Sequence, residues 1–347
     1  MKTLASCEAR RLPYLVKFGL TCLVPYLYAF ALTTILLQSC RQEQDTLKEG
    51  TQPQQAEQTA VMPVIPEFNA TRSFDYLLKQ TSFGPRNPGS RGHAECRRYL
   101  MGELGRLANR VRVQDFTHHG YDGERLSLTN IIGVFNPSAT QRILLCAHWD
   151  TRPRAEHDED PARWNEPIIG ANDGASGVAV LLEIANHLKT SPPAIGVDIV
   201  FFDGEDYGKE GDTQNYLLGS RYFAKNREQD YVPRFGILLD MVGDKYLEIP
   251  KEESSTKFAP DIVDLVWKKA KELGMTQFID AVGEAVIDDH LPLNEAGIKT
   301  IDIIDFNYPD PTHRFWHTHN DVPENCSSES LAAVGTVVMH VVYAQRP

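Results

Sequence analysis

Short apolar runs alternate with segments of helical spacing from Phe68 to the end of the chain. Runs that are largely apolar on both faces predict the buried strands of a covered sheet: Leu128–Phe135, Arg142–Ala147, Val197–Phe202, Phe235–Leu239 and Thr300–Ile304. Apolar residues at helical spacing predict helices over Gly177–Leu188, Asp261–Leu273 and Ser327–Tyr343. The alternation predicts an α/β fold: a single αβα domain over residues 67–347, with a mostly parallel central sheet flanked by helices.

The first 40 residues have a different pattern. Four basic residues, Lys2, Arg10, Arg11 and Lys17, come before the uncharged apolar stretch Gly19–Leu37, as in a secretory signal. The sequence LQSC at 37–40 resembles a bacterial lipobox with Cys40 as the lipidated residue. A signal that is only cleaved, and an anchor that is retained, are the alternatives. Each predicts an exported domain, facing the periplasm or on the surface, that meets the membrane only through its N-terminal lipid or anchor.

Residues 41–66 are rich in Gln, Glu, Thr and Pro and predict a polar tether.

The chain as a whole is 42% hydrophobic, enough for a substantial core. Its net charge of −12 argues against nucleic acid as a partner. The cysteines show no zinc-finger spacing, and Cys96, Cys146 and Cys326 are expected to be small buried apolar side chains.

Acids and histidines follow the predicted strands or the turn before a helix: His148, Asp150, Asp173, Glu205, Asp206, Asp240 and His317. The carboxyl ends of parallel strands form the ligand crevice of an open α/β sheet. A catalytic zinc takes His nitrogens and carboxylate oxygens, usually from three protein ligands. One Asp at a helix start is more often an N-cap, and one loop His is more often a surface residue. It is the joint pattern that indicates a metal site.

Three motifs together resemble zinc peptidases of the M28 aminopeptidase type: HWD at 148–150, GANDGASG at 170–177 and FFDGED at 201–206. Two later motifs, DDH at 288–290 and FWHT at 315–318, resemble one branch of these proteins, the glutaminyl-peptide cyclotransferases or glutaminyl cyclases. The sequences EDY at 205–207 and DMVG at 240–243 are similar to those of the Bacteroidetes members of that branch. The match runs from about residue 70 to the C-terminus.

The resemblance implies one catalytic Zn²⁺ held by Asp173, Asp206 and His317. It implies the conversion of an N-terminal glutamine, on peptides or proteins, to pyroglutamate with release of ammonia. Glu205, beside a zinc ligand, is the expected proton shuttle between the attacking amine and the leaving ammonia.

The resemblance also implies roles in the substrate pocket. Asp240 and Asp288 are the acidic hydrogen-bond partners that the family has in this pocket. If either carboxyl lay against that of Glu205, the two groups would titrate as a coupled pair. Trp316 is the expected apolar wall against the glutamine side chain. His148 and Asp150 could bind a second metal or orient the ligands, and the resemblance favours orientation.

The chain departs from the animal cyclases in one loop of the pocket. Those enzymes carry a Trp after the acidic pair, whereas residues 209–212 contain no aromatic side chain. Tyr207, Tyr216 or Phe315 are candidates to fill that wall. The acidic segment Glu156–Asp160 lacks the EF-hand spacing with its central Gly and is expected to be a solvated turn.

Two other functions fit parts of this pattern. A two-zinc aminopeptidase needs His148, Asp173, Glu205, Asp206, Asp240 and His317, and all of them are present. The DDH and FWHT motifs favour the cyclase over it. An inactive surface binding protein on the same fold is the third hypothesis, and the complete ligand set with Glu205 argues against it.

Overall fold

The structure is a computed structural model and describes residues 65–347. The predicted leader, Cys40 and nearly all of the tether lie outside the described residues. Within 65–347, no helix has both the length and the apolar character that a membrane span requires.

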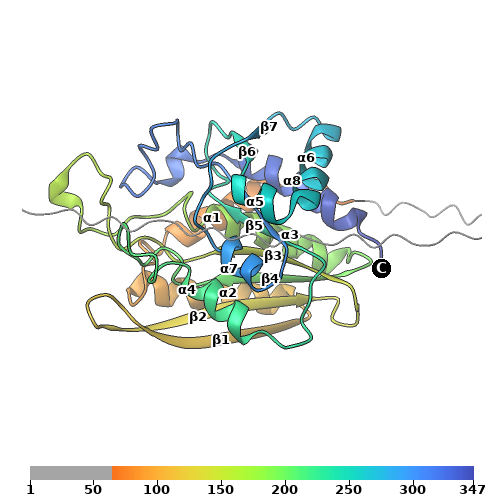
Figure 1. The fold of residues 1–347 in the computed structure, drawn as a ribbon, viewed down its shortest axis with the longest axis horizontal. Coiled ribbons are helices and arrows are strands. Elements are labelled where there is room, and N and C mark those ends of the chain that lie inside the picture. Colours follow the sequence, from red (N-terminus) through yellow and green to blue (C-terminus); the bar gives the residue numbers. More distant parts are fainter. Residues whose placement is uncertain (1–64) are drawn as a thin grey trace, which may run out of the picture. The chain divides into compact units, whose positions relative to one another are not determined.

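The domain is built on a six-stranded sheet, counted over the described residues, with the order β1-β2-β4-β3-β5-β8 (Figure 1). Its strands are β1 (Arg110–His119), β2 (Arg125–Phe135), β3 (Arg142–His148), β4 (Gly196–Phe202), β5 (Gly236–Asp240) and β8 (Thr300–Ile304). Strands β4, β3, β5 and β8 are parallel, and β1 and β2 form an antiparallel edge. The predicted α/β architecture with a mostly parallel sheet is confirmed.

Strand β1 was not among the predicted strands. Its sequence, RVRVQDFTHH, alternates polar residues that are mostly exposed with residues that are only half-buried. It pairs on one side with β2 and lies at the edge of the sheet. An edge strand needs no continuous apolar run, so the pattern that revealed the buried strands is missing here.

Helices cover both faces of the sheet. One face packs against α1 (Ala70–Thr81), α2 (Arg91–Leu107), α3 (Ser176–Thr190), α6 (Pro260–Glu272) and α8 (Ser328–Ala344). The other packs against α4 (Leu218–Asn226) and α7 (His290–Glu295). Strand β3 serves both cores, since Ile143 and Leu145 join the first cluster and Leu144 and Cys146 the second.

Smaller elements complete the described domain: α5 (Glu253–Phe258), the two-stranded pair β6 (Ile249–Lys251) and β7 (Phe278–Val282), and the 3₁₀ turns η1 (Pro161–Arg163) and η2 (Pro323–Asn325). Cys96, Cys146 and Cys326 are buried and unpaired, as expected.

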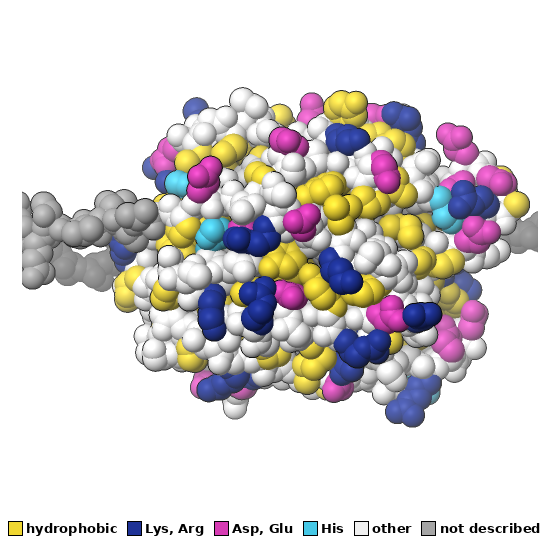
Figure 2. All heavy atoms as spheres, turned by 180° about the vertical axis from the view of Figure 1, so that it is seen from behind, with side chains coloured by type: hydrophobic (Ala, Val, Ile, Leu, Met, Phe, Trp, Pro, Cys, Tyr) yellow, Lys and Arg dark blue, Asp and Glu magenta, His cyan; other side chains and the backbone are white. Residues whose placement is uncertain are grey.

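Figure 2 shows the opposite side of the molecule, where apolar side chains gather near the middle with basic and acidic side chains mixed around them.

The start of helix α3 lies directly on strand β5. A Cβ atom at Gly177 would be 2.1 Å from the carbonyl oxygen of Leu239, so only glycine allows this approach. The loop that ends at α3 carries Asp173, and β5 ends at Asp240. This glycine therefore allows the two acids to approach each other at the carboxyl edge of the sheet.

Candidate metal centre and active site

The residues singled out from the sequence meet at the carboxyl edge of the sheet. His148 is the last residue of β3 and Asp240 the last of β5, while Glu205 and Asp206 stand in the loop after β4. The loop before α3 and the loop after β8 add the remaining two ligand candidates, Asp173 and His317. All of these side chains are buried, with at most 9% of any residue exposed.

Asp173, Asp206 and His317 form a group that can hold a metal ion. One donor atom from each lies within 4.8 Å of the other two. The Nε2 atom of His317 is 3.3 Å from Oδ1 of Asp206 and 3.7 Å from Oδ2 of Asp173. The second oxygen of Asp206, Oδ2, is buried and has no hydrogen-bond partner. Two carboxylates, an imidazole and an unsatisfied buried oxygen fit the donor set of a catalytic zinc.

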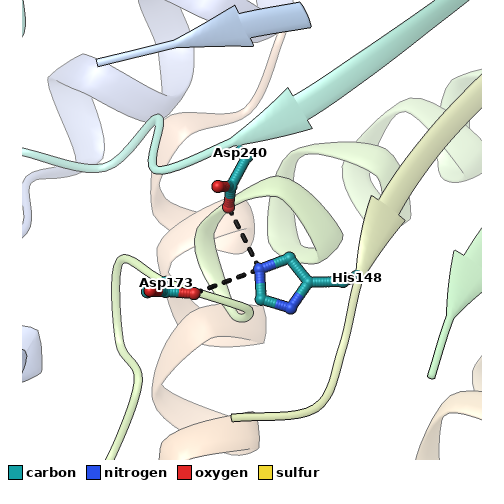
Figure 3. Close-up of side chains that lie close together, drawn as sticks. All are labelled: His148, Asp173 and Asp240. Atoms are coloured by element: carbon teal, nitrogen blue, oxygen red, sulfur yellow. Dashed lines mark hydrogen bonds and ion pairs between the residues drawn. The ribbon is translucent and has the colours of Figure 1, made fainter. Parts of the chain in front are cut away.

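A second group shares one of these ligands. His148 Nε2 lies 3.1 Å from Oδ1 of Asp173 and 3.1 Å from Oδ1 of Asp240 (Figure 3). These three residues also have donor atoms within 4.8 Å of one another. The geometry therefore allows a second ion, or allows His148 to act as a hydrogen-bond partner of both acids.

Asp150 belongs to neither group. Its carboxylate accepts hydrogen bonds from the backbone N–H groups of Glu205, at 3.1 Å, and Asp206, at 3.3 Å. Its Oδ1 atom is also 3.7 Å from Nδ1 of His148. These contacts suit a residue that orients the acidic pair rather than one that binds a metal.

The charges of the site oppose one another strongly without a bound cation. Burial, together with the nearby charge of Asp206, raises the pKa of Asp173 well above its usual value. Burial lowers the pKa of His317 to about 4. Burial acts against ionisation of Asp206 as well, but His317 and Arg152 more than offset it and lower the pKa of that carboxyl. A dication beside Asp173 would favour its ionised form, which is a further reason that the site suits a metal.

Glu205 sits among these charges without being part of either group. Burial raises its pKa well above the usual value, although His148, with Nδ1 at 4.0 Å from its carboxylate, acts in the opposite direction. Within residues 65–347 its side chain makes no hydrogen bond to Asp240 or Asp288, and Asp288 contributes to its raised pKa through charge alone. Asp288 has its own pKa raised to about 6, by burial and then by the charge of Asp240.

A small cavity of about 60 Å³ opens onto this cluster of acids. It is lined by Asp173, Glu205, Asp206, Tyr216, Asp240, Met241, Val286, Ile287, Asp288, Ile304, Phe306, Trp316 and His317. The ring of Trp316 stacks on His317 with centroids 3.8 Å apart and meets Phe306 edge-on at 5.0 Å. A larger cavity of about 580 Å³, beside α6 and β7, contains none of the predicted site residues.

Tyr207, Tyr216 and Phe315 were the candidates for the aromatic wall of this cavity. Of the three candidates only Tyr216 lines it. Tyr207 stacks on Tyr121 with centroids 4.9 Å apart, and Phe315 packs against Tyr308 at 5.4 Å. Phe306, which the sequence did not single out, supplies the remaining aromatic wall.

The segment Glu156–Asp160 is a turn, as expected, but it is only partly solvated. Glu156 is ion-paired with the buried guanidinium of Arg152, and its side chain is 17% exposed. Asp158 accepts hydrogen bonds from the backbone N–H of His319 at 3.0 Å and from its Nδ1 at 2.8 Å. Two of these acids therefore attach the segment to the neighbourhood of His317, and only the rest of it is exposed.

Other buried charges that the sequence did not reveal hold the ligand loops. Asp321 accepts the backbone N–H groups of Asn172, at 2.7 Å, and Asp173, at 3.1 Å. The guanidinium of Arg86 donates to the carbonyl oxygens of Trp149, at 3.1 Å, and Gly170, at 2.7 Å. Neither residue stands in a metal motif, so only the folded chain identifies their function.

The chain resembles known proteins over most of its length. The model of peptidase family M28 matches residues 130–342. A glutaminyl cyclase structure from Bacteroides thetaiotaomicron is 43% identical with a TM-score of 0.78, covering 82% of this chain and 100% of the other. A Zn-dependent exopeptidase from Parabacteroides distasonis is 41% identical with a TM-score of 0.78, covering 81% and 100%. A bovine glutaminyl-peptide cyclotransferase is 25% identical over 71% of this chain and 74% of its own. The chain belongs to peptidase family M28.

Proposed function

We propose that the protein is a zinc-dependent glutaminyl-peptide cyclotransferase that closes the N-terminal glutamine of peptides and proteins to pyroglutamate. The observation that carries this proposal is the 43% identity to a bacterial glutaminyl cyclase whose whole length is covered. The small cavity beside Asp173, Asp206 and His317 agrees with it, because its aromatic walls suit one uncharged side chain.

Asp173, Asp206 and His317 would hold the zinc, which when bound supplies a Lewis acid for the γ-carboxamide oxygen of the substrate. The attack is intramolecular, since the substrate's own α-amine reaches the carbonyl carbon of the γ-carboxamide group. The protein therefore has to hold the folded-back conformer, and Trp316, Phe306 and Ile304 form the walls that can do so.

Glu205 is placed to handle the protons of this reaction. Its carboxylate accepts a proton from the attacking amine as the new C–N bond forms, and delivers it to the carboxamide nitrogen, which leaves as ammonia. A pKa raised by burial suits both steps, because the group must first be a base and then an acid near neutral pH. Asp150 keeps the backbone of Glu205 in place during both.

Asp240 and Asp288 complete the acidic side of the pocket. Asp240 is oriented by His148, while Oδ2 of Asp288 is buried without a hydrogen-bond partner and the residue lines the cavity. We assign both to hydrogen bonds with the amine or amide nitrogen of the substrate, which arrives with N–H groups to donate.

Mass spectrometry of a glutamine-initiated peptide tests the proposal. Incubation with the soluble domain should remove one ammonia, with no change in a matched peptide that begins with alanine. A chelator should abolish the reaction and added zinc restore it. A zinc-loaded protein that leaves the glutamine peptide intact would rule the cyclase out.

The second candidate is a two-zinc aminopeptidase, and the His148–Asp173–Asp240 group is the observation that favours it. This enzyme would release the first residue from both peptides and would bind two equivalents of zinc. The same incubation therefore separates the two functions, since the cyclase releases ammonia and no free amino acid.

The first 40 residues support a proposal about the cellular location of the protein. We propose export, with a lipid on Cys40 as the membrane attachment, because a basic region, an apolar stretch and LQSC stand in that order. Cell fractionation of wild type and Cys40→Ala tests this: the wild type should be in the membrane fraction and the variant in the soluble periplasmic fraction. Equal distribution of the two would overturn the lipid attachment.

A further inference from the structure

A buried arginine contacts one of the metal-ligand candidates. Only 1% of the Arg152 side chain is exposed. Its Nη1 atom donates to Oδ1 of Asp206 at 2.7 Å and to the carbonyl oxygen of the same residue at 3.2 Å. Arg152 therefore holds both the side chain and the backbone of Asp206.

The other nitrogens of Arg152 reach two further groups. Nη2 donates to the hydroxyl of Tyr216 at 2.6 Å, and Nε donates to Oε2 of Glu156 at 3.0 Å. Tyr216 lines the cavity beside the metal candidates, whereas Glu156 belongs to the segment packed near His317. A planar guanidinium can direct separate N–H groups to three acceptors in this way, and an ammonium group cannot reproduce that fork.

The contact with Arg152 makes the two oxygens of Asp206 different. Oδ1 accepts the hydrogen bond from the guanidinium and lies 3.3 Å from Nε2 of His317, while Oδ2 is buried and has no hydrogen-bond partner. Rotation of the carboxylate would break the hydrogen bond from Arg152. The arginine thus fixes the direction of the Asp206 carboxylate relative to His317 and leaves Oδ2 free of protein hydrogen bonds.

We propose that Arg152 is a positioning residue, which fixes the orientation of the metal-ligand candidate Asp206 and holds Tyr216 in the wall of the substrate pocket. The part that concerns Tyr216 rests on the proposed function, whereas the part that concerns Asp206 is independent of the substrate. Groups that orient a metal ligand in this way typically contribute about 10–100-fold to metal affinity.

Zinc affinity of Arg152→Gln, measured by competition with a chromophoric chelator and without substrate, tests the first part. We expect affinity to fall about 10–100-fold relative to wild type. The matched control is Arg142→Gln, because Arg142 is also a largely buried arginine, paired with Asp198 at 2.7 Å, but stands at the opposite end of β3. Its zinc affinity should equal that of wild type.

Circular dichroism of both variants establishes that they are folded. If Arg152→Gln does not fold, Arg152→Lys with Arg142→Lys as its control replaces the pair, and a fall in zinc affinity is expected only for Arg152→Lys. A folded Arg152 variant that binds zinc as tightly as wild type would overturn the proposal, and so would an equal loss in the control.

Tyr216→Phe tests the second part, since it removes the hydroxyl and keeps the ring. We expect an increase in KM for a glutamine peptide, with kcat and zinc affinity close to those of wild type. An unchanged KM would remove Tyr216 from the proposal. Inactivity of the wild type would refute the cyclase instead, and would leave the zinc measurements on Arg152 as they stand.

Discussion

Replacement of Glu205 by glutamine separates proton transfer from every other property of the site. Glutamine has nearly the same shape, and the backbone N–H of residue 205 keeps its 3.1 Å hydrogen bond to Asp150. The residue belongs to neither group of metal-ligand candidates, so zinc should still bind. An amide is a very weak base, so it cannot accept the proton of the attacking amine.

The expected loss in kcat is the full contribution of general acid–base catalysis, about 10²–10⁴-fold, or roughly 3–5 kcal/mol in the activation barrier. The stability of the variant relative to the wild type should rise with pH. Burial raises the pKa of Glu205, and a raised pKa means that its contribution to stability is lost as the pH rises through the folded-state value. Above that pH the wild type buries a charge that the variant lacks.

The assay is the release of ammonia from a glutamine peptide at pH 8, with zinc affinity measured separately by chelator competition. Glu272→Gln is the control, because Glu272 is an exposed residue on α6 that should leave the rate unchanged. A Glu205→Gln variant that binds zinc and works within a few-fold of the wild-type rate would refute the assignment of Glu205 as the proton shuttle.

Three further results are expected. Removal of zinc should lower the thermal midpoint as well as abolish activity, because free zinc at 1,000 times its Kd stabilises the folded state by about 4 kcal/mol; equal midpoints with and without zinc would contradict this. Asp288→Asn should lower activity yet raise stability at pH 8, since a pKa raised to about 6 means that the stability contribution is complete below the unfolded value and lost as the pH rises past 6. Urea unfolding should show that the unfolding free energy of Asp288→Asn exceeds that of the wild type by up to roughly 3 kcal/mol at pH 8, and that this difference disappears near pH 4. Leu144→Ala, fully buried in the smaller core, should cost about 2–5 kcal/mol in unfolding free energy and leave zinc affinity unchanged.

The sequence predicted the parts of the fold whose pattern is imposed by burial. Strands β3, β4, β5 and β8 are apolar on both faces, because helices cover the sheet on each side, and they were located to within a residue or so at each end. Strand β1 was missed because its outer residues are polar and it has a single neighbour. Strand β2 was located from its apolar run, but its antiparallel pairing with β1 could not be predicted in the same way.

The candidate ligands could be proposed from the sequence for a different reason. Zinc accepts few residue types, and the ends of parallel strands are a predictable place for them. The residues that hold those ligands are not restricted in this way. Arg152 meets Asp206 across 54 positions of the chain, and Asp321 meets Asn172 across 149. Any suitably placed donor or acceptor could serve, so only the path of the folded chain identifies them.

These two kinds of residue depend on each other physically. Asp173, Asp206 and Asp240 are brought together in a buried site, where burial and then the charges of the other two acids raise the pKa of Asp173. A chain that relied on the metal alone to hold them would lose the arrangement whenever the metal left. Arg152 and Asp321 attach two of the ligand loops through hydrogen bonds that need no metal. The binding site can therefore persist before the metal arrives, and zinc affinity and the stability of this edge of the sheet should change together when either kind of residue is altered.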